Sequence, residues 1–459
     1  MSQWWDDDVA MLWNPPRSFD DLFPPLTRHV VPPTVWHALA LLHRGTGDDV
    51  PRALRAIHAV AACQYDEPGT PWHGTFARFR EFPYPQPDAV EYAGFDPNWR
   101  QFVGTGFLLA LRTAGDRIPS ATAAVMTRAI RLALDGEPAD RVSPAYSNIA
   151  LMRAWLEVEG GAHVGRDDLV RRGGELAVAV VERFRARRAL DEWNSPTYYG
   201  IDLYALALWR SQSELLGAWG AEIEGGLWAD LAPWYHAGLA NVAGPYTRAY
   251  GMDMRSYAAA LGFWISPYSH GQRPTPDLDR PFRHTHDLSL WPIAALLGSD
   301  VPDGPCAHLR EFQGERTLEQ VLSTRPERVA SAWLASEVMI GAERGARTWK
   351  STGQYHPATI HWRAQDGATG WVRLHHAGPV EATAGTNTLT ARGGDTARPI
   401  RFRVSGYESV EGDRWCLPGL TVRVQSNAEY AGVEQRETGA VLTYEPPASG
   451  PATFELDVS

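Results

Sequence analysis

The spacing of apolar residues changes once along this chain of 459 residues, and the change restricts the folds that it can adopt. Up to about residue 300, apolar residues recur three or four positions apart, as Met254, Tyr257 and Leu261 do, which places them on one face of a helix. After Pro326 they alternate with polar residues, as in residues 400–405, which is typical of strands that bury one side. Helices followed by strands predict two packed modules rather than an alternating α/β fold.

The helical part is predicted to close on itself. Successive helical hairpins pack as an open solenoid or as a closed ring, and no fixed sequence period indicates the solenoid. We therefore predict an α+β multidomain protein, with an α/α toroid (an incomplete (α/α)6-type barrel) over residues 1–300, a connector at 301–327 and an antiparallel β-sandwich at 328–459. Loops at one end of such a ring surround a central cavity. The predicted helices lie at residues 34–45, 50–64, 97–114, 118–136, 144–160, 167–188, 196–213, 215–240, 253–265 and 288–298.

Charge and composition exclude several classes of partner. The net charge of -11 argues against nucleic acid, whose phosphates require clustered Lys and Arg. The N-terminus has neither a basic region nor an apolar region of a signal peptide, and no apolar run is long enough to span a membrane. Three well-separated cysteines suit reduced thiols and have no metal-ligand spacing. We therefore expect a soluble, cytoplasmic protein that binds neither nucleic acid nor membranes.

Aromatic residues are unusually abundant, with 19 Trp, 16 Tyr and 14 Phe. Flat aromatic faces commonly line clefts that hold sugar rings, because one face of a pyranose is apolar. The alternative is that these side chains fill a wide helical core. Trp72, Trp99 and Trp193 are the better candidates for a cleft, since each lies beside polar residues in a loop-like segment.

The segment from residue 191 to 210 contains a clear helix start. Ser195 followed by Pro196 is typical of a capped first turn, so Asn194 stands just outside a helix N-terminus. That end of a helix favours a bound carboxylate, to which an Asn amide adds a donor. Tyr198 and Tyr199 follow in the first turn. The alternative is that Asn194 shapes a turn and the tyrosines pack.

Residues 235–257 combine polar and aromatic side chains more densely than an ordinary core does. A histidine, tyrosine hydroxyls and fixed positive charge are suited to moving protons next to an anion. The alternative is a helix end with an exposed histidine and packed tyrosines. The candidate residues are His236, Tyr246, Arg248, Tyr250, Asp253 and Arg255.

This arrangement resembles a known group of enzymes. A toroid before a β-sandwich, with Asn194, then His236, then Tyr246 and either Arg248 or Arg255, is similar to polysaccharide lyases of the hyaluronate, chondroitin and xanthan type and to their heparinase II/III-like relatives. The resemblance implies β-elimination at a uronic acid of an oligosaccharide or polysaccharide, without metal or other cofactor. Tyr250 competes with Tyr246 for the catalytic place.

The implied reaction assigns roles to these residues. The proton on C5 of a uronate is weakly acidic until the carboxylate is neutralised, so a lyase needs donors on the carboxylate, a base at C5 and an acid at the leaving oxygen. Asn194 and an arginine would neutralise, a tyrosine of lowered pKa would take and return the proton, and His236 would act as base or assist. Substrate-binding residues are expected among Trp72, His73, Trp99, Asn148, Tyr198, Tyr199, Asp253, Tyr268, His270 and His284.

Two other functions fit the same sequence. Inverting glycosidases on α/α toroids use two carboxylates about 6.5 to 9.5 Å apart, for which Glu192, Asp202 and Asp253 are available. A carbohydrate-binding protein without catalysis would use the aromatics alone. His284 and His286 with Asp287 form only a weak metal-ligand pattern, so no metal is predicted.

Overall fold

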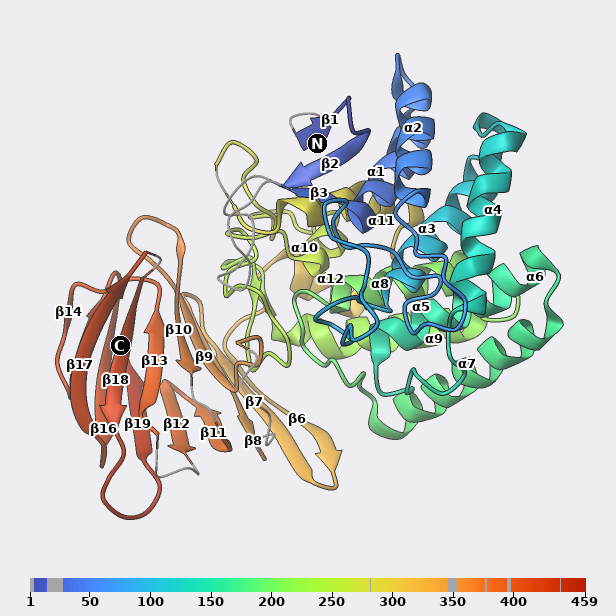
Figure 1. Cartoon of the computed structure of the whole chain (residues 1–459). Coiled ribbons are helices and arrows are strands. Elements are labelled where there is room, and N and C mark those ends of the chain that lie inside the picture. Colours follow the sequence, from blue (N-terminus) through green and yellow to red (C-terminus); the bar gives the residue numbers. More distant parts are fainter. Residues whose placement is uncertain are drawn as a thin grey trace.

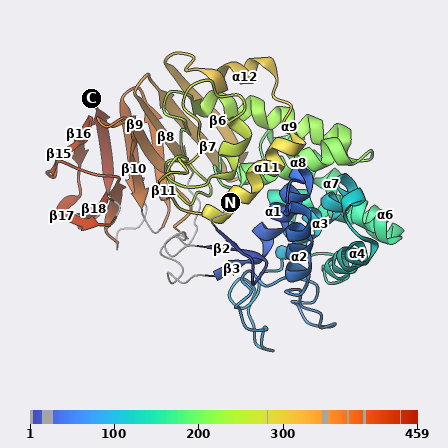
Figure 2. The same cartoon turned by 90° about the horizontal axis from the view of Figure 1, so that it is seen from above.

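The computed structural model describes residues 4–14, 28–280, 282–345, 353–375, 378–393, 398–437 and 439–459. Helices dominate the N-terminal part and antiparallel sheets form the C-terminal part (Figure 1). The prediction of helices before strands is therefore confirmed. Figure 2 shows the sheets as a layer beside the helices. A small sheet of β1 (Trp5–Asp6), β2 (Met11–Asn14) and β3 (Arg28–Val30) precedes the first helix.

The helices pack in a circuit. In the order α1, α3, α5, α8, α10, α11, each helix contacts the next one. The last of them, α11, packs on α1 and closes the circuit. α2, α4, α7 and α9 lie against α1, α3, α5 and α8 respectively. The bounds are α1 (Val31–Arg44), α2 (Asp49–Ala61), α3 (Trp99–Thr113), α4 (Ser120–Asp135), α5 (Ser147–Trp155), α6 (Gly161–Val164), α7 (Asp167–Arg187), α8 (Tyr199–Gln212), α9 (Gly217–Leu231), α10 (Ala260–Ile265), α11 (Trp291–Leu297) and α12 (Asp303–Arg310).

Sequence pattern explains which helices belong to the circuit. α8 is apolar on nearly every side, and Leu203, Leu206 and Trp209 are fully buried, so it needs neighbours all round. α7 instead carries one apolar stripe that includes Val180 and Phe184, with charged residues opposite. A helix with one apolar stripe is stable on the outside of the bundle.

Two predicted helices are shorter than the apolar spacing suggests. The helix predicted at 215–240 ends at Leu231, where Pro233 follows within a 3-10 turn and the chain becomes extended. The helix predicted at 253–265 begins only at Ala260. The Asp253 carboxylate accepts a hydrogen bond from the backbone N–H of Arg255, a local turn that competes with helix formation.

The C-terminal part contains two antiparallel sheets that share one core. The eight-stranded sheet has the order β17-β18-β13-β10-β9-β8-β7-β6 and the six-stranded sheet the order β11-β12-β19-β16-β15-β14. Trp333, Phe402, Trp415 and Leu456 belong to the core between them. The bounds are β6 (Arg316–Thr324), β7 (Glu327–Leu334), β8 (Val338–Arg344), β9 (Ala358–Arg363), β10 (Thr369–His375), β11 (Val380–Gly385), β12 (Thr388–Gly393), β13 (Ile400–Val404), β14 (Ser409–Val410), β15 (Arg414–Leu417), β16 (Leu420–Ser426), β17 (Glu429–Arg436), β18 (Gly439–Glu445) and β19 (Thr453–Val458).

The segment predicted as a connector, residues 301–327, contains α12 and strand β6, so the sheet begins at Arg316 rather than at 328. β6 is the last strand of its sheet, and most of its side chains are partly or fully exposed. An edge strand of this kind lacks the apolar alternation that marks a half-buried strand.

Residues 235–257 form the seam between the helices and the large sheet. Tyr246 and His356 exchange two backbone hydrogen bonds of 2.9 Å each. Gly341 in β8 has no side chain, and the backbone of Gly244 occupies the space where a Cβ would lie. The segment begins with β4 (Tyr235–His236), paired with β5 (Asn241–Val242). Many polar groups of residues 235–257 are therefore used in contacts between the helices and the large sheet.

Among the helices of the described residues, none has both the length and the apolar content needed to cross a membrane.

The seam makes Gly341 sensitive to substitution. In Gly341→Ala, the new Cβ would lie 1.9 Å from the carbonyl oxygen of Gly244, so β8 and the seam must separate. We expect the free energy of unfolding to fall by about 1–3 kcal/mol. Gly225→Ala is the control, because a Cβ at this position in α9 meets no atom within 4 Å, and it should gain about 0.5–1 kcal/mol. Urea denaturation measures both changes, and equal stability of the two variants would contradict the close contact.

A buried histidine at the seam makes stability depend on pH. His361 is fully buried; its Nε2 donates to the Met252 carbonyl at 2.9 Å, and its Nδ1 has no hydrogen-bond partner among the described residues. Burial lowers the pKa of His361 from 6.5 to about 4. The neutral imidazole therefore contributes stability above pH 6.5 that is lost as the pH falls from 6.5 towards 4.

We expect His361 to contribute a decrease of about 3 kcal/mol over that pH range. His361→Gln keeps a donor for Met252 but does not titrate. Its free energy of unfolding should therefore fall less steeply between pH 6.5 and 4 than that of the unmodified protein. Parallel slopes for the two proteins would show that His361 does not titrate in this way.

Candidate active site

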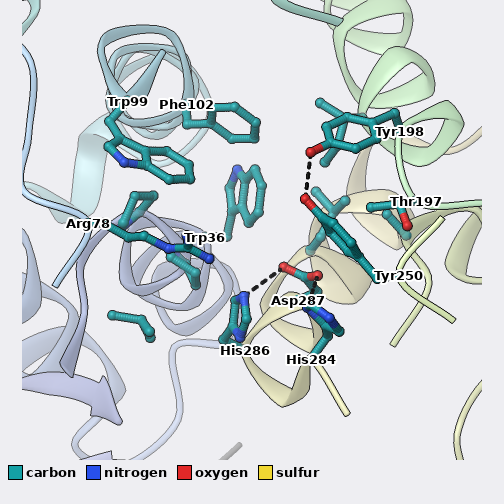
Figure 3. Close-up of a pocket in the computed structure, with 16 residues that line it drawn as sticks. Trp36, Arg78, Trp99, Phe102, Thr197, Tyr198, Tyr250, His284, His286 and Asp287 are labelled. Carbon is teal, nitrogen blue, oxygen red and sulfur yellow. Dashed lines mark hydrogen bonds and ion pairs between the residues drawn. The ribbon is translucent and has the colours of Figure 1, made fainter. Parts of the chain in front are cut away.

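A pocket opens among the helices, and its two sides differ in chemistry (Figure 3). Trp36, Trp99 and Phe102 lie on one side, and Tyr198 and Tyr250 face them from the other. A set of polar groups lies at its base. The lining residues are Val30, Pro32, Pro33, Trp36, Arg78, Trp99, Phe102, Thr197, Tyr198, Ile201, Tyr250, Ala260, His284, His286, Asp287 and Leu290.

The helix starts of the circuit position these side chains. Trp99 is the first residue of α3, and Tyr198 immediately precedes α8. Ser195 fixes the start of α8, since its hydroxyl accepts a hydrogen bond of 3.0 Å from the backbone N–H of Tyr198. This contact agrees with the helix start expected at Ser195 and Pro196. Tyr250 arrives from the seam, and His284 precedes the 3-10 helix at Thr285–Leu290.

Two tyrosine hydroxyls meet beside a partly buried arginine. The hydroxyls of Tyr198 and Tyr250 are 2.6 Å apart, and Arg248 donates to Tyr198 through Nη2 at 2.6 Å. The guanidinium also lies over the Tyr198 ring, 3.7 Å from its centroid. Burial raises the pKa of Tyr250, while the charge of Arg248 and the hydrogen bond with Tyr198 oppose that rise. Tyr250 is therefore a protonated phenol in neutral solution.

Glu192 balances the charge of Arg248. Its Oε1 accepts a hydrogen bond of 2.8 Å from Arg248 Nη1, and its Oε2 accepts bonds from the backbone and side-chain nitrogens of Asn148. Asp202, one turn into α8, is fully buried, and neither of its carboxyl oxygens has a hydrogen-bond partner among the described residues. Burial, and to a lesser extent the nearby Glu192, raises the pKa of Asp202 well above its usual value, which favours its neutral form. The arrangement therefore holds the Arg248 guanidinium, paired with Glu192, behind the two tyrosines.

Five of the six predicted catalytic residues are not among those that line this pocket, and four of the five serve the seam instead. The Asn194 amide donates to the carbonyls of Ala243 and Pro245, at 2.7 and 2.8 Å. The Tyr246 hydroxyl is buried and donates to the carbonyl of Val242. These two side chains hold the turns of the seam.

His236 and Arg255 also serve the seam. His236 donates through Nε2 to the Ala335 carbonyl at 2.7 Å, accepts from the Leu239 N–H at Nδ1 and stacks on Phe312. Arg255 donates to side-chain oxygens of Gln272 and Thr369, each at 2.7 Å. Tyr250 lines the pocket, and Arg248 supports it through Tyr198.

Some of the predicted substrate-binding residues line the pocket, and the others do not. Trp99, Tyr198 and His284 line the pocket. Asn148 supports Glu192, Tyr199 is buried in the core, and Asp253 is buried next to Arg255. The others lie outside the lining: Trp72 bonded to Glu67, His73 near Asp66, Tyr268 bonded to the Ser299 carbonyl, and His270 exposed to solvent.

Several lining residues carry no distinguishing signal in the sequence. Trp36 and Phe102 belong to the apolar pattern of α1 and α3 and look like ordinary core residues. Arg78 lies in an Arg- and Phe-rich loop, residues 69–82, from which His73 was the more prominent candidate. Phe102 lies in the first turn of α3, one of the helices of the circuit. That position is the one feature that could have identified it as a lining residue.

Comparison with known proteins gives two family matches. Residues 1–299 match the model of a family described as a domain of unknown function, DUF8769, and residues 315–438 match a second one, DUF8770. No curated protein matches the sequence.

The solved structures that match this chain include three at low identity. Heparinase III has 9% identity, covering 92% of this chain and 75% of that protein, with a TM-score of 0.46. Chondroitin AC lyase of Streptomyces coelicolor A3, in complex with chondroitin sulphate, has 12% identity, with coverage of 93% and 74% and a TM-score of 0.47. A mutant of Rex8A from Paenibacillus barcinonensis, complexed with an arabinofuranosyl-xylotetraose, has 11% identity, with coverage of 66% and 87% and a TM-score of 0.36. At these scores the likenesses carry no weight for what this chain binds.

The ion pair beneath the tyrosines should be essential for stability. Arg248→Met leaves the Glu192 carboxylate, only 8% exposed, without its cation. We expect the free energy of unfolding to fall by about 3–5 kcal/mol, and the double variant with Glu192→Gln to recover part of that loss. Arg185→Met is the control, because Arg185 and Glu222 form an exposed pair worth less than about 1 kcal/mol. Additive effects of the two changes at 248 and 192 in thermal or urea denaturation would contradict a coupled pair.

Proposed function

The chain belongs to the family described as a domain of unknown function, DUF8769. We propose that it is a carbon–oxygen lyase, which cleaves the glycosidic bond at a uronic acid of an oligosaccharide or polysaccharide by β-elimination. The proposal depends on one observation. The hydroxyls of Tyr198 and Tyr250 lie 2.6 Å apart, supported by Arg248, in a pocket whose opposite side is aromatic.

Each part of the pocket supplies one requirement of the reaction. Trp99, which is partly exposed, offers an aromatic face on which the apolar face of a sugar ring can stack. Arg78 supplies a positive charge in the lining that suits the C6 carboxylate, whose neutralisation makes the C5 proton more acidic. Tyr250 must first release its hydroxyl proton to solvent; its tyrosinate oxygen then accepts the proton from C5, and the hydroxyl formed in this way donates that proton to the leaving oxygen on C4.

Tyr198 and Arg248 have positioning roles in this mechanism. When Tyr250 loses a proton, its oxygen becomes an anion that the Tyr198 hydroxyl can stabilise by donating a hydrogen bond. Arg248 in turn holds Tyr198 by a hydrogen bond and by its charge over the ring. The positive charge that favours the tyrosinate is thus provided by Arg248, while Arg78 replaces Asn194 and Arg255 as the group assigned to the carboxylate.

The positions of the carboxylates support elimination rather than hydrolysis as the reaction. An inverting hydrolase needs two carboxyl groups facing the scissile bond. Among the described lining residues, Asp287 is the only carboxylate. The three predicted for hydrolysis are elsewhere: Glu192 pairs with Arg248, Asp202 is enclosed in the core, and Asp253 is buried next to Arg255.

The catalytic assignment is tested by two matched Tyr→Phe changes. Tyr250→Phe removes the proton-transfer group, and we expect kcat to fall by about 10²–10⁴-fold. Tyr246→Phe removes a hydroxyl that contacts the Val242 carbonyl outside the pocket, so it should keep kcat within a few-fold of the unmodified enzyme. Ultraviolet absorbance of the new C4=C5 double bond, followed across a panel of uronate-containing oligosaccharides and polymers, measures the rate.

Each alternative function gives a distinct result in the same experiment. New reducing ends without ultraviolet absorbance would identify a hydrolase. Saturable sugar binding without turnover, unchanged in Tyr250→Phe, would identify a carbohydrate-binding protein. Full lyase activity in Tyr250→Phe, with loss of activity in Tyr246→Phe, would place the proton transfer at the seam instead.

A further inference from the structure

Three potential metal ligands converge at the base of the pocket (Figure 3). The distance from His286 Nε2 to Asp287 Oδ1 is 3.4 Å, and that from His284 Nδ1 to Asp287 Oδ2 is 3.9 Å. One ligand atom from each of the three residues can be chosen so that all lie within 4.8 Å of one another. All three residues line the same pocket as Tyr250.

The backbone at His284 brings these side chains together. His284 has a left-handed conformation with φ of 55°, which a residue with a side chain adopts at an energetic cost, and the 3-10 helix Thr285–Leu290 follows directly. The His284 ring stacks on Tyr250, with the centroids 4.5 Å apart and the planes at 8°. Packing against the tyrosine therefore fixes the orientation of this imidazole.

The spacing fits a tetrahedral zinc site. Zn²⁺ lies about 2.0–2.2 Å from His nitrogen and carboxylate oxygen, so ligand atoms in a tetrahedral site are about 3.4 Å apart. The two measured separations, which end on different oxygens of Asp287, are at this value or half an ångström above it. Two imidazoles favour a transition metal over Ca²⁺ or Mg²⁺, which prefer oxygen ligands.

We propose that His284, His286 and Asp287 form a Zn²⁺ site whose fourth position is open to the pocket. Three protein ligands with one open position are typical of zinc sites that act on a substrate rather than of closed structural sites. The metal would bind an oxygen of the substrate's uronate carboxylate and neutralise it together with Arg78. This role rests on the proposed function, whereas the binding of zinc does not.

Zinc binding is tested directly on the tag-free full-length chain after dialysis against EDTA. Isothermal titration with Zn²⁺, with metal content measured by mass spectrometry after desalting, should give one tightly bound ion per chain. Asp287→Asn and His286→Gln remove a ligand with little change in volume. Each should weaken binding by more than the roughly 10–100-fold that loss of an outer partner of a zinc site causes.

Two exposed residues provide matched controls. Asp277→Asn and His270→Gln make the same chemical changes on the surface and should leave the stoichiometry and affinity unchanged. Circular dichroism of each variant establishes that it is folded. If a ligand variant fails to fold, Co²⁺ added to the unmodified chain still tests whether the metal site exists. Co²⁺ in a four-coordinate site with two imidazoles gives strong absorption bands in the visible range. Absence of those bands, absence of bound Zn²⁺, or equal binding by Asp287→Asn and Asp277→Asn would overturn the site.

The same preparations separate this site from the proposed reaction. One bound Zn²⁺ with no cleavage of any uronate substrate would support the metal site and refute the lyase. Cleavage at an undiminished rate by the EDTA-treated chain would support the lyase and refute the metal's role. Cleavage that is lost on EDTA treatment and restored by one equivalent of Zn²⁺ would support both.

Discussion

The backbone pairing between the seam and the large sheet is the constraint on which the site depends. Tyr246 pairs with His356 through two hydrogen bonds, and the N–H of Ala249 donates to the carbonyl of Gln354. Arg248 lies between these anchored residues, so its guanidinium is held where it reaches both Glu192 and Tyr198. The two C-terminal sheets supply none of the described lining residues. They contribute to the site by fixing the loop that carries the charge.

The order of structural elements could be predicted from sequence because it depends on local periodicity. The apolar stripe of α7 and the start of α8 after Ser195 are properties of neighbouring residues. The irregular region before α10 could not be predicted in this way, since its course follows from contacts with the sheet. β6 was missed for the related reason that an edge strand buries too little to impose a pattern on its sequence.

The chemistry of the site was only partly predictable. Tyr198, Tyr250 and Trp99 were identified as candidates and line the pocket. Asn194 and Tyr246 were equally plausible, but their polar groups are used by backbone carbonyls in the seam. Which carbonyls lack a partner in a turn-rich segment is decided by tertiary packing. A sequence therefore shows that polar groups are abundant, but not which of them are left for a substrate.

The pocket joins the two ends of the helical part of the chain. Val30 and Pro32 lie on its wall together with Asp287 and Leu290, and α11 packs on α1. Contacts this far apart in sequence form slowly, because a long loop must close before they contribute any stability. During synthesis, this wall of the pocket can form only after nearly the whole helical part has left the ribosome. The binding pocket is thus among the last features of the helical part to form, and a chain truncated before residue 284 would have helices but no complete site.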